Sequence, residues 1–415
     1  MPLPFLESVL FDGLPEWMPD LRYIFAAVVV VGTLYAIKTY CGGMLNQAER
    51  DMHGRVIMIT GGTSGIGAET ARGLAERGAQ IVLLTRLPPS NPFLADFVGQ
   101  MRDKTGNEMI YAEQVDLTSL HSIRKFATKW VDNVPPRRLD MIILCAATLT
   151  PPGSKRMQTE EGIEETWMVN YLANFHLISI LNPAIKAQPF DRDVRVIIPT
   201  CSAYISAPPL SVDLDEKSWT PSRAYARSKL ALMSFGQAYQ KHLDSYKRPD
   251  QLPMTARVLF VDPGLARTPG MRRWLTRGSI WGLFLYVAGY FVPWLFLKSA
   301  EMGAQTVLYA ALEQSLVRGP GGKFLKECIE VDFARVDVKD EKVAEELWKA
   351  SDKLIEKTER ESAALRALEK KNEELKEKER QDAEKANDIG ALVDTIKKGK
   401  EAEKAKSRRK SKKAT

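Results

Sequence analysis

A tyrosine and a lysine stand four residues apart in the stretch Tyr225-Ala226-Arg227-Ser228-Lys229. Residues at this spacing lie on one face of a helix, so an ammonium group would lie beside a phenol. A neighbouring cation favours the phenolate and lowers the pKa of tyrosine from about 10. The pair could therefore transfer a proton near neutral pH, although the same spacing also occurs by chance in many proteins.

A glycine-rich stretch supports a catalytic role for this pair. The residues Thr60-Gly61-Gly62-Thr63-Ser64-Gly65-Ile66-Gly67 follow an apolar run and open a helical pattern. Glycines in such a turn let the backbone approach a pyrophosphate, which binds at the N-terminus of the helix. By itself, the stretch could equally be a tight strand-to-helix turn without a ligand.

The elements that would position these residues alternate between strand-like and helix-like stretches from Arg55 to about Asp332. The strand-like stretches are continuous apolar runs, which are typical of strands buried on both faces. The pattern predicts an α/β fold with a doubly wound parallel sheet. The predicted strands are Val56–Thr60, Ile81–Thr85, Ile110–Val115, Met141–Cys145, Val194–Pro199, Ala256–Val261 and Lys323–Ile329.

In this order, the glycine-rich turn and the Tyr-Lys pair resemble the short-chain dehydrogenase/reductase family over roughly residues 53–332. Its membrane-associated, retinol-dehydrogenase-like branch is the most similar. The resemblance implies a Rossmann fold and an NADP- or NAD-dependent oxidoreductase. Smaller motifs add to it, namely Asp116-Leu117, Gly162-Ile163-Glu164 leading to Val169-Asn170-Tyr171, and Pro263-Gly264 with Thr268.

The resemblance implies four catalytic residues. Tyr225 would be the general acid/base, and Lys229 would hold the ribose and depress the pKa of Tyr225. Ser202 would polarise the substrate carbonyl, with Cys201 as the adjacent candidate for the same position. Asn170 would complete a proton relay through water, or would instead satisfy a buried backbone group.

The same resemblance implies the cofactor-binding residues. The second predicted strand ends in Leu84-Thr85-Arg86, without an acidic residue. A ribose 2′-hydroxyl needs an acidic partner there and a 2′-phosphate needs a cation, which favours NADP(H) over NAD(H). Arg86 could also be a solvated surface residue. The full set is Gly61, Ser64, Gly65, Ile66, Gly67, Arg86, Asp116, Leu117, Tyr225, Lys229, Pro263, Gly264 and Thr268.

One motif departs from the family pattern. The family's Asn-Asn-Ala-Gly after the fourth strand is replaced here by Cys145-Ala146-Ala147-Thr148. In the family, the first Asn ties strands together and the Gly lets the backbone approach the cofactor. The departure therefore bears on sheet geometry and cofactor fit, but it removes no proton-transfer group.

Residues 1–45 predict a membrane anchor. The uncharged run Tyr23–Ile37 can extend toward Met44 and Leu45 if Lys38 snorkels, although a buried core helix is the alternative. Acidic residues before the run argue against a cleaved signal peptide. More Lys and Arg follow the run than precede it, which places the catalytic domain in the cytosol. The endoplasmic reticulum and the lipid-droplet surface both fit.

A second apolar run, 280–297, lies inside the predicted catalytic domain, residues 46–335. It is long enough to span a bilayer, but Gly282, Gly289 and Pro293 interrupt it. The strand predicted after it must also rejoin the same sheet. We therefore expect a monotopic helix or an apolar lid. This element would either border the substrate mouth or only contact membrane lipids.

The C-terminal region differs in composition from the domain. Residues 336–396 predict a charged helix with a weak coiled-coil signal, which could bind a protein partner or self-associate through 340–390. Residues 397–415 predict a disordered basic tail. Residues 397–413 of this tail carry a net charge of +8, which leaves −1 for the rest of the chain. No specific nucleic-acid binding is expected, and the dispersed Cys and His residues predict no metal site.

These observations predict a membrane-bound oxidoreductase. It would transfer a hydride between NADP(H) and a lipophilic carbonyl or alcohol, such as a retinoid, a sterol or a long-chain aldehyde. The alternative is a catalytically degenerate membrane scaffold that recruits partners through its C-terminal helix. The intact catalytic residues favour the enzyme, whereas Cys145, Thr148 and the long extension favour the scaffold.

Overall fold

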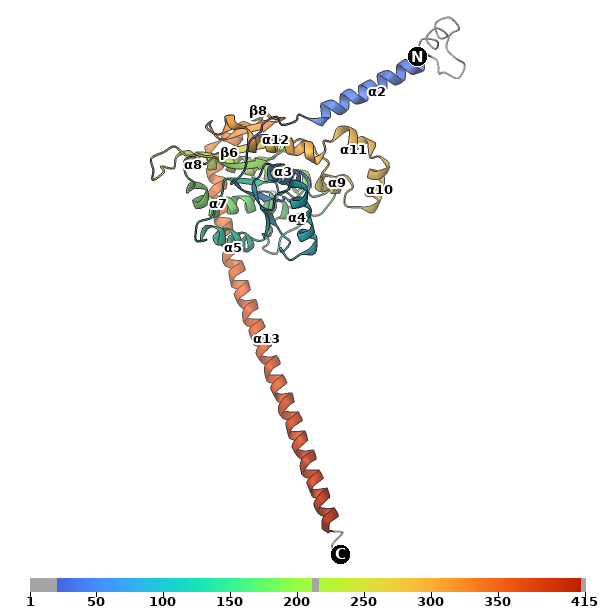
Figure 1. Cartoon of the computed structure of the whole chain (residues 1–415), viewed down its shortest axis with the longest axis vertical. Coiled ribbons are helices and arrows are strands. Elements are labelled where there is room, and N and C mark those ends of the chain that lie inside the picture. Colours follow the sequence, from blue (N-terminus) through green and yellow to red (C-terminus); the bar gives the residue numbers. More distant parts are fainter. Residues whose placement is uncertain (1–20, 211–215, 412–415) are drawn as a thin grey trace. The chain divides into compact units, whose positions relative to one another are not determined.

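The computed structural model describes residues 21–210 and 216–411. Within them, eight strands form one sheet in the order β3-β2-β1-β4-β5-β6-β7-β8 (Figure 1). The first seven are parallel and β8 is antiparallel. The predicted doubly wound sheet is therefore confirmed. The strands are β1 Val56–Thr60, β2 Gln80–Thr85, β3 Ile110–Gln114, β4 Met141–Leu144, β5 Val194–Pro199, β6 Ala256–Asp262, β7 Lys323–Lys326 and β8 Ile329–Val331.

Helices cover both faces of the sheet. On one face, α3 (Gly65–Ala75), α4 (Pro92–Thr105) and α12 (Ala300–Leu312) share an apolar core with the strands. On the other, α5 (Leu120–Val131), α7 (Ala173–Lys186) and α8 (Pro221–Asp244) pack together. This two-sided burial explains the continuous apolar runs of the central strands. Short helical turns are α6 Glu165–Trp167, η1 Met168–Leu172, η2 Ser202–Ser206, η3 Gln314–Leu316 and η4 Val336–Lys339.

The last predicted strand, Lys323–Ile329, is in fact a hairpin. β7 and β8 pair antiparallel around Glu327 and Cys328, whose φ angles are 50° and 58°. Two consecutive residues with positive φ form the tight turn that suits a two-residue hairpin. Neither residue is Gly or Asn, so the sequence carried no turn signal at this point.

A buried ionic cluster lies at the amino ends of the strands. Asp193 accepts hydrogen bonds from Arg50 (2.6 Å) and from Arg195 (2.9 Å), and Arg195 is fully buried. Arg195 also donates to the backbone carbonyls of Ala310 and Glu313, at the end of α12. A guanidinium at this position satisfies the last carbonyls of the helix. The cluster therefore fixes α12 and the chain near Arg50 to the sheet.

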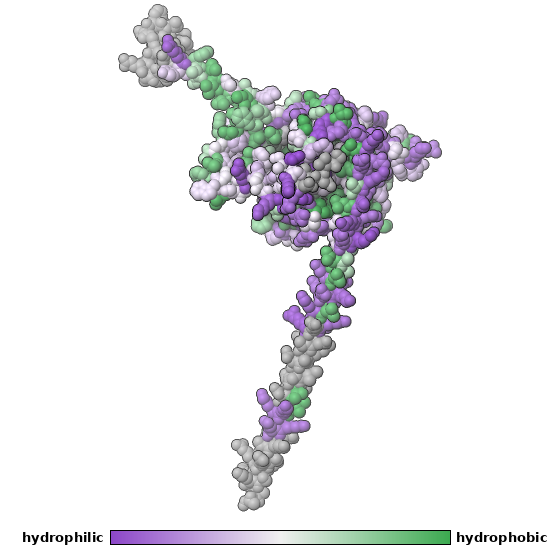
Figure 2. Space-filling view, turned by 180° about the vertical axis from the view of Figure 1, so that it is seen from behind, coloured by the Kyte–Doolittle hydropathy of each residue, from purple (hydrophilic) through white to green (hydrophobic). Residues whose placement is uncertain are grey.

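The apolar runs form exposed helices. α2 (Leu21–Gly42) is, among the described residues, the one helix that by length and composition could cross a membrane. Residues 1–20 of the predicted anchor segment lie outside the description. The run 280–297 folds as two short helices, α10 (Ile280–Ala288) and α11 (Phe291–Phe296), preceded by α9 (Pro269–Leu275). Figure 2 shows apolar side chains gathered along α2 and on the protrusion beside it.

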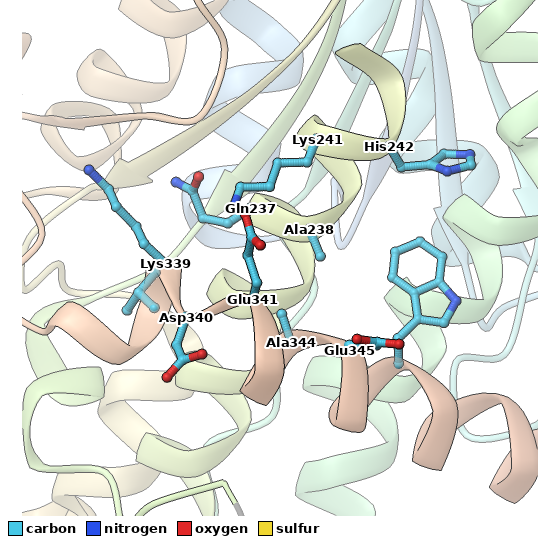
Figure 3. Close-up of a pocket in the computed structure, with 11 residues that line it drawn as sticks. Gln237, Ala238, Lys241, His242, Lys339, Asp340, Glu341, Ala344 and Glu345 are labelled. Carbon is cyan, nitrogen blue, oxygen red and sulfur yellow. Dashed lines mark hydrogen bonds and ion pairs between the residues drawn. The ribbon is translucent and has the colours of Figure 1, made fainter. Parts of the chain in front are cut away.

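The last helix, α13 (Glu341–Ser411), begins as part of the same compact unit as the sheet. Trp348 packs against Phe175 of α7 and Phe235 of α8, with both ring centroids 5.4 Å away. Figure 3 shows Lys241 and Glu341 pointing toward each other from α8 and α13, and their charged groups lie 2.5 Å apart. They line a cavity of about 260 Å³ that contains none of the predicted site residues.

The compact unit therefore extends to Lys353, beyond the predicted boundary at 335. The second unit, Leu354–Thr415, is helical as far as Ser411. Residues 397–411 are thus helical where the sequence predicted a disordered tail. The reason is the composition of this stretch, because Lys, Ala and Glu are strong helix formers.

Candidate active site

Tyr225 and Lys229 lie in the first three turns of α8, which Thr220 caps by accepting from the backbone N–H of Arg223 (3.3 Å). The Lys229 ammonium lies 5.7 Å from the centroid of the Tyr225 ring. It donates to the carbonyl oxygen of Pro199, at the end of β5 (3.2 Å). Both side chains therefore lie at the carboxyl edge of the sheet, where parallel sheets bind ligands.

The electrostatics of this pair differ from the sequence-based expectation. Burial raises the pKa of Tyr225, and Cys201 and Asp262 raise it further. Burial lowers the pKa of Lys229, against the opposite effect of Cys201, Cys145 and Asp262. Because desolvation dominates, the predicted lowering of the Tyr225 pKa by Lys229 does not hold here. A protonated phenol is suited to donating a proton, as a general acid does.

The segment after β5 brings Cys201, and not Ser202, to this tyrosine. Cys201 Sγ lies 3.7 Å from the hydroxyl oxygen of Tyr225. The Ser202 hydroxyl instead donates to Asp262 Oδ2 (2.9 Å), and the second carboxylate oxygen of Asp262 accepts from the N–H of Gly264 (2.9 Å). Cys201 has an extended backbone. Neighbouring side chains in an extended stretch point to opposite sides, so only one of the two faces Tyr225.

Asn170 is fully buried in the π-helical turn η1. Its side chain accepts from the N–H of Thr148 (2.7 Å) and donates to the Thr148 carbonyl (3.0 Å). It also donates to the hydroxyl of Ser228 (3.1 Å), next to Lys229. Asn170 thus links the loop after β4 to α8 and satisfies buried backbone groups. Its part in a proton relay stays a prediction.

The altered motif after β4 leaves the sheet intact. β1 and β4 pair in parallel register along β4. The Thr60 hydroxyl accepts from the N–H of Ala146 (3.1 Å), and Asn170 holds Thr148 as described above. Burial raises the pKa of Cys145 to about 12, so its thiol stays protonated. Thr60 and Asn170 therefore connect this loop to its neighbours without the family's first Asn.

The turn between β1 and α3 allows a close approach to its backbone. Gly61 has a φ of 66°, and a Cβ there would lie 2.8 Å from the Cα of Ala146. A Cβ on Gly67 would lie 2.3 Å from the carbonyl oxygen of Gly61. Ser64 precedes the first helical residue, Gly65, and its side chain makes no capping hydrogen bond. The first amides of α3 and this hydroxyl are therefore suited to an anionic ligand.

The loop after β6 lies against this turn. Thr268 caps α9 by accepting from the N–H of Met271 (3.2 Å), and a Cβ on Gly65 would lie 3.1 Å from Thr268 Cγ2. Pro263 is buried, and Gly264 has a φ of 74°. The predicted Pro-Gly-Thr residues and the glycine-rich turn are therefore brought together. Ile66, also predicted, packs instead toward Gly303 of α12.

The remaining predicted residues follow β2 and β3. Arg86 comes directly after β2 and is exposed, and its backbone carbonyl accepts from Gln114 (3.3 Å). Asp116 accepts from the backbone N–H and the hydroxyl of Thr118 (2.9 and 2.7 Å), with Leu117 half-buried between them. These positions continue the carboxyl edge beyond β1. Together with the glycine-rich turn, the residues present fit an extended dinucleotide.

Sequence reasoning missed Asp262 and Arg335. Asp262 is buried at the end of β6 and holds Ser202. The sequence signal that could have identified Asp262 is a charged residue at the end of an apolar strand. Arg335 donates to backbone carbonyls of η2, the turn that follows Cys201, and to the carbonyl of Ala207 just after it. No sequence signal could find it, because it lies far along the chain from η2. The described residues contain no cluster of His, Cys, Asp and Glu that could hold a metal ion.

Comparisons with known proteins agree with this geometry. The family model described as short chain dehydrogenase matches residues 55–277. An uncharacterized oxidoreductase, pbr1, of Schizosaccharomyces pombe is 38% identical, covering 87% of this chain and 97% of that protein. Mouse polyprenol dehydrogenase is 32% identical over 71% of this chain and 82% of its own. Mouse retinol dehydrogenase 13 is 29% identical over 79% and 91%, respectively.

The chain belongs to the short-chain dehydrogenase family, in its retinol-dehydrogenase-like branch, and the resemblance seen in the sequence is confirmed. The class of activity is that of an oxidoreductase.

Proposed function

We propose that this protein transfers a hydride between NADP(H) and a lipophilic carbonyl or alcohol at a membrane surface. The observation that carries the proposal is the placement of Tyr225 and Lys229 at the carboxyl edge of the sheet that also bears the glycine-rich turn. A proton-transfer group and a dinucleotide site thus occupy the same edge, which is what a nicotinamide-dependent oxidoreductase needs.

The protein's own groups perform the proton chemistry. When bound, the nicotinamide cofactor supplies or accepts the hydride. In the reductive direction, the protonated phenol of Tyr225 donates its proton to the substrate oxygen. Lys229 holds the ribose, and Asn170 fixes the loop after β4 beside α8. Two side chains are candidates for polarising the substrate carbonyl. Cys201 contacts the Tyr225 hydroxyl, and the Ser202 hydroxyl donates to Asp262. Measuring kcat after substituting each residue by Ala shows which of the two polarises the carbonyl.

Arg86 supports NADP(H) over NAD(H). It is exposed directly after β2, and no acidic side chain ends that strand. A guanidinium forms strong, charge-assisted hydrogen bonds with a 2′-phosphate. NAD(H) has no 2′-phosphate and would not form these hydrogen bonds with Arg86.

The lipophilic substrate class is supported by two observations. Apolar side chains of α10 and α11, among them Trp281 and Phe284, are largely exposed. Two of the relatives named above act, by their names, on retinol and polyprenol, which are alcohols with long apolar chains. We place α10 and α11 at the membrane, where such a substrate dissolves, with the substrate mouth beside them.

We place the catalytic domain on the cytosolic face of the endoplasmic reticulum or of a lipid droplet, with α2 as the anchor. The support is the excess of Lys and Arg after α2 compared with before it. The part of α13 that follows Lys353 is the segment proposed for a protein partner or for self-association, because residues up to Trp348 pack on α7 and α8. The rival function is a membrane scaffold without turnover.

The test is cofactor-dependent turnover of a panel of lipophilic carbonyls by the full-length protein in detergent. Tyr225→Phe removes only the transferable proton and should lower kcat by about 10²–10⁴-fold while leaving cofactor affinity nearly intact. Tyr246→Phe is the matched control, because Tyr246 lies beyond the end of α8. Absence of turnover across the panel, with NADPH still bound, would favour the scaffold. Equal rates for Tyr225→Phe and the parent would refute the catalytic assignment.

A further inference from the structure

The segment from Pro263 to Ala300 has an unusual charge distribution. It carries Arg267, Arg272, Arg273, Arg277 and Lys298, and it contains no Asp or Glu. The rest of the chain ahead of the basic tail has a slight excess of acidic residues. This local excess of five cations lies next to the most apolar part of the domain and creates a positive surface potential there.

Three of these arginines have no carboxylate partner among the residues that the structure describes. Arg272 and Arg273 lie on α9, and Arg277 follows it, and all three are exposed. None makes an ion pair with any residue in the described part of the chain. The other two cations are engaged, because Arg267 donates to the Tyr290 hydroxyl (2.5 Å) and Lys298 pairs with Glu327. We call Arg272, Arg273 and Arg277 the arginine triplet.

The arginine triplet adjoins an apolar surface. α10 and α11 follow it directly and expose large apolar side chains, including Ile280 (80%), Trp281 (75%) and Leu285 (69%). Arg277 itself borders a hollow of about 650 Å³ between α9 and these helices, lined mostly by apolar residues. A cation beside an apolar hollow matches a molecule with an anionic head and a hydrocarbon chain.

The end of α2 lies beside the same surface. Lys38 donates to the carbonyl oxygen of Trp294 in α11 (2.6 Å), and its ammonium lies 4.8 Å from the centre of the Trp294 ring. Figure 2 shows the continuity of apolar side chains from α2 onto the neighbouring protrusion. If α2 spans the bilayer, Lys38 lies at its domain-side boundary. α9 then lies at the level of the lipid headgroups, and α10 and α11 lie at the boundary between headgroups and acyl chains, where Trp and Tyr also concentrate.

The geometry points to a docking surface for an anionic lipid bilayer, in which the arginine triplet binds headgroup phosphates or carboxylates and α10 and α11 insert among the acyl chains. This inference rests on the membrane placement in the proposed function and adds a choice of lipid. It would hold the carboxyl edge of the sheet against an anionic membrane, since Thr268 caps α9 and also lies beside Gly65 of the glycine-rich turn.

The size of the effect follows from surface electrostatics. Each Arg near an anionic leaflet contributes about 1 kcal/mol, or roughly fivefold in affinity, so the triplet should strengthen docking by about 100-fold. The effect should decline as salt shortens the Debye length below about 10 Å. Neutral lipid should give only the apolar part of the docking.

Hydrogen exchange of the full-length protein in vesicles measures docking without requiring turnover. Amides of residues 269–297 should exchange up to about 100-fold more slowly in phosphatidylcholine vesicles with phosphatidylserine than in phosphatidylcholine alone. The variant Arg272→Gln/Arg273→Gln/Arg277→Gln, and high salt, should remove this difference.

The matched control is Lys104→Gln/Lys125→Gln/Arg138→Gln, which removes three exposed cations from α4, α5 and the segment before β4. None of the three makes an ion pair with another described residue. The control should keep the effect of phosphatidylserine. If the triplet variant kept it too, or if neutral vesicles slowed exchange equally, the inference would be wrong.

A titration with NADPH in detergent excludes a different role for the triplet. The triplet variant should bind NADPH as the parent does. Weakened binding would show that these arginines are cofactor ligands, which overturns the lipid assignment. If the parent protein showed no turnover, only the proposed function would be contradicted, because neither the hydrogen-exchange measurement nor the NADPH titration requires turnover.

Discussion

Arg335 should control the position of η2, the turn that follows Cys201, through hydrogen bonds to backbone carbonyls. It follows β8, and its guanidinium donates to the backbone carbonyls of Tyr204 (3.3 Å), Ile205 (3.4 Å) and Ala207 (2.5 Å). It also forms a two-point ion pair with Asp337 (2.9 and 2.5 Å). Arg335→Met keeps a side chain of similar reach and removes these donors. We expect η2, which follows Cys201, to loosen.

The magnitude can be estimated bond by bond. The short bond to Ala207 has a charged donor and is worth about 1.5–3 kcal/mol. The two bonds at 3.3–3.4 Å are near the limit of useful length and add little. Asp337 is 34% exposed, so its ion pair contributes at most about 1 kcal/mol. A loss of about 2 kcal/mol raises the displaced fraction of η2 roughly 30-fold, and a misplaced catalytic segment should lower kcat by at least about tenfold.

The assay combines hydrogen exchange of the amides of residues 202–207 with kcat and KM in detergent, well below the melting temperature. Arg335→Met should speed this exchange and lower kcat while leaving the KM for NADPH nearly unchanged. Arg335→Lys should restore part of both, since an ammonium can still reach one carbonyl. Asp337→Asn serves as the control and should have little effect. Unchanged exchange in Arg335→Met would refute the reasoning, whatever happens to the melting temperature.

Four further predictions concern single groups. Arg86→Asp should weaken NADPH binding far more than NADH binding in parallel titrations, because it sets a like charge against the 2′-phosphate. Asp193→Ala should cost about 3–5 kcal/mol in the free energy of unfolding, measured by denaturant titration, because it leaves Arg195 buried without a counter-charge. Cys145 should resist iodoacetamide at pH 8 until the protein unfolds, since burial raises its pKa to about 12. Burial also raises the pKa of Tyr225, so its neutral phenol should support carbonyl reduction at a rate that does not change through neutral pH. The contribution of the neutral phenol to the free energy of unfolding is present below about pH 10 and is lost above it.

The sequence alone determined the parallel sheet and the positions of its strands from β1 to β6. β1 and β5 begin and end where the apolar runs do, because strands covered on both faces need uninterrupted apolar residues. The glycine-rich turn was equally readable, since only glycine fits where a Cβ would meet Ala146 or the carbonyl of Gly61. The β7–β8 hairpin was not readable, because Glu327 and Cys328 adopt positive φ without being the residues that favour it.

Only the tertiary structure decided how the candidate catalytic residues are supported. Whether Cys201 or Ser202 faces Tyr225 depends on which side of an extended segment turns toward α8, and a one-residue shift would reverse it. The pKa of Tyr225 is raised first by burial and then by Cys201 and Asp262, which only the folded chain brings to it. Arg335 reaches η2 only because the chain after β8 folds back over it. Such contacts join residues far apart in sequence, and local spacing carries no information about them.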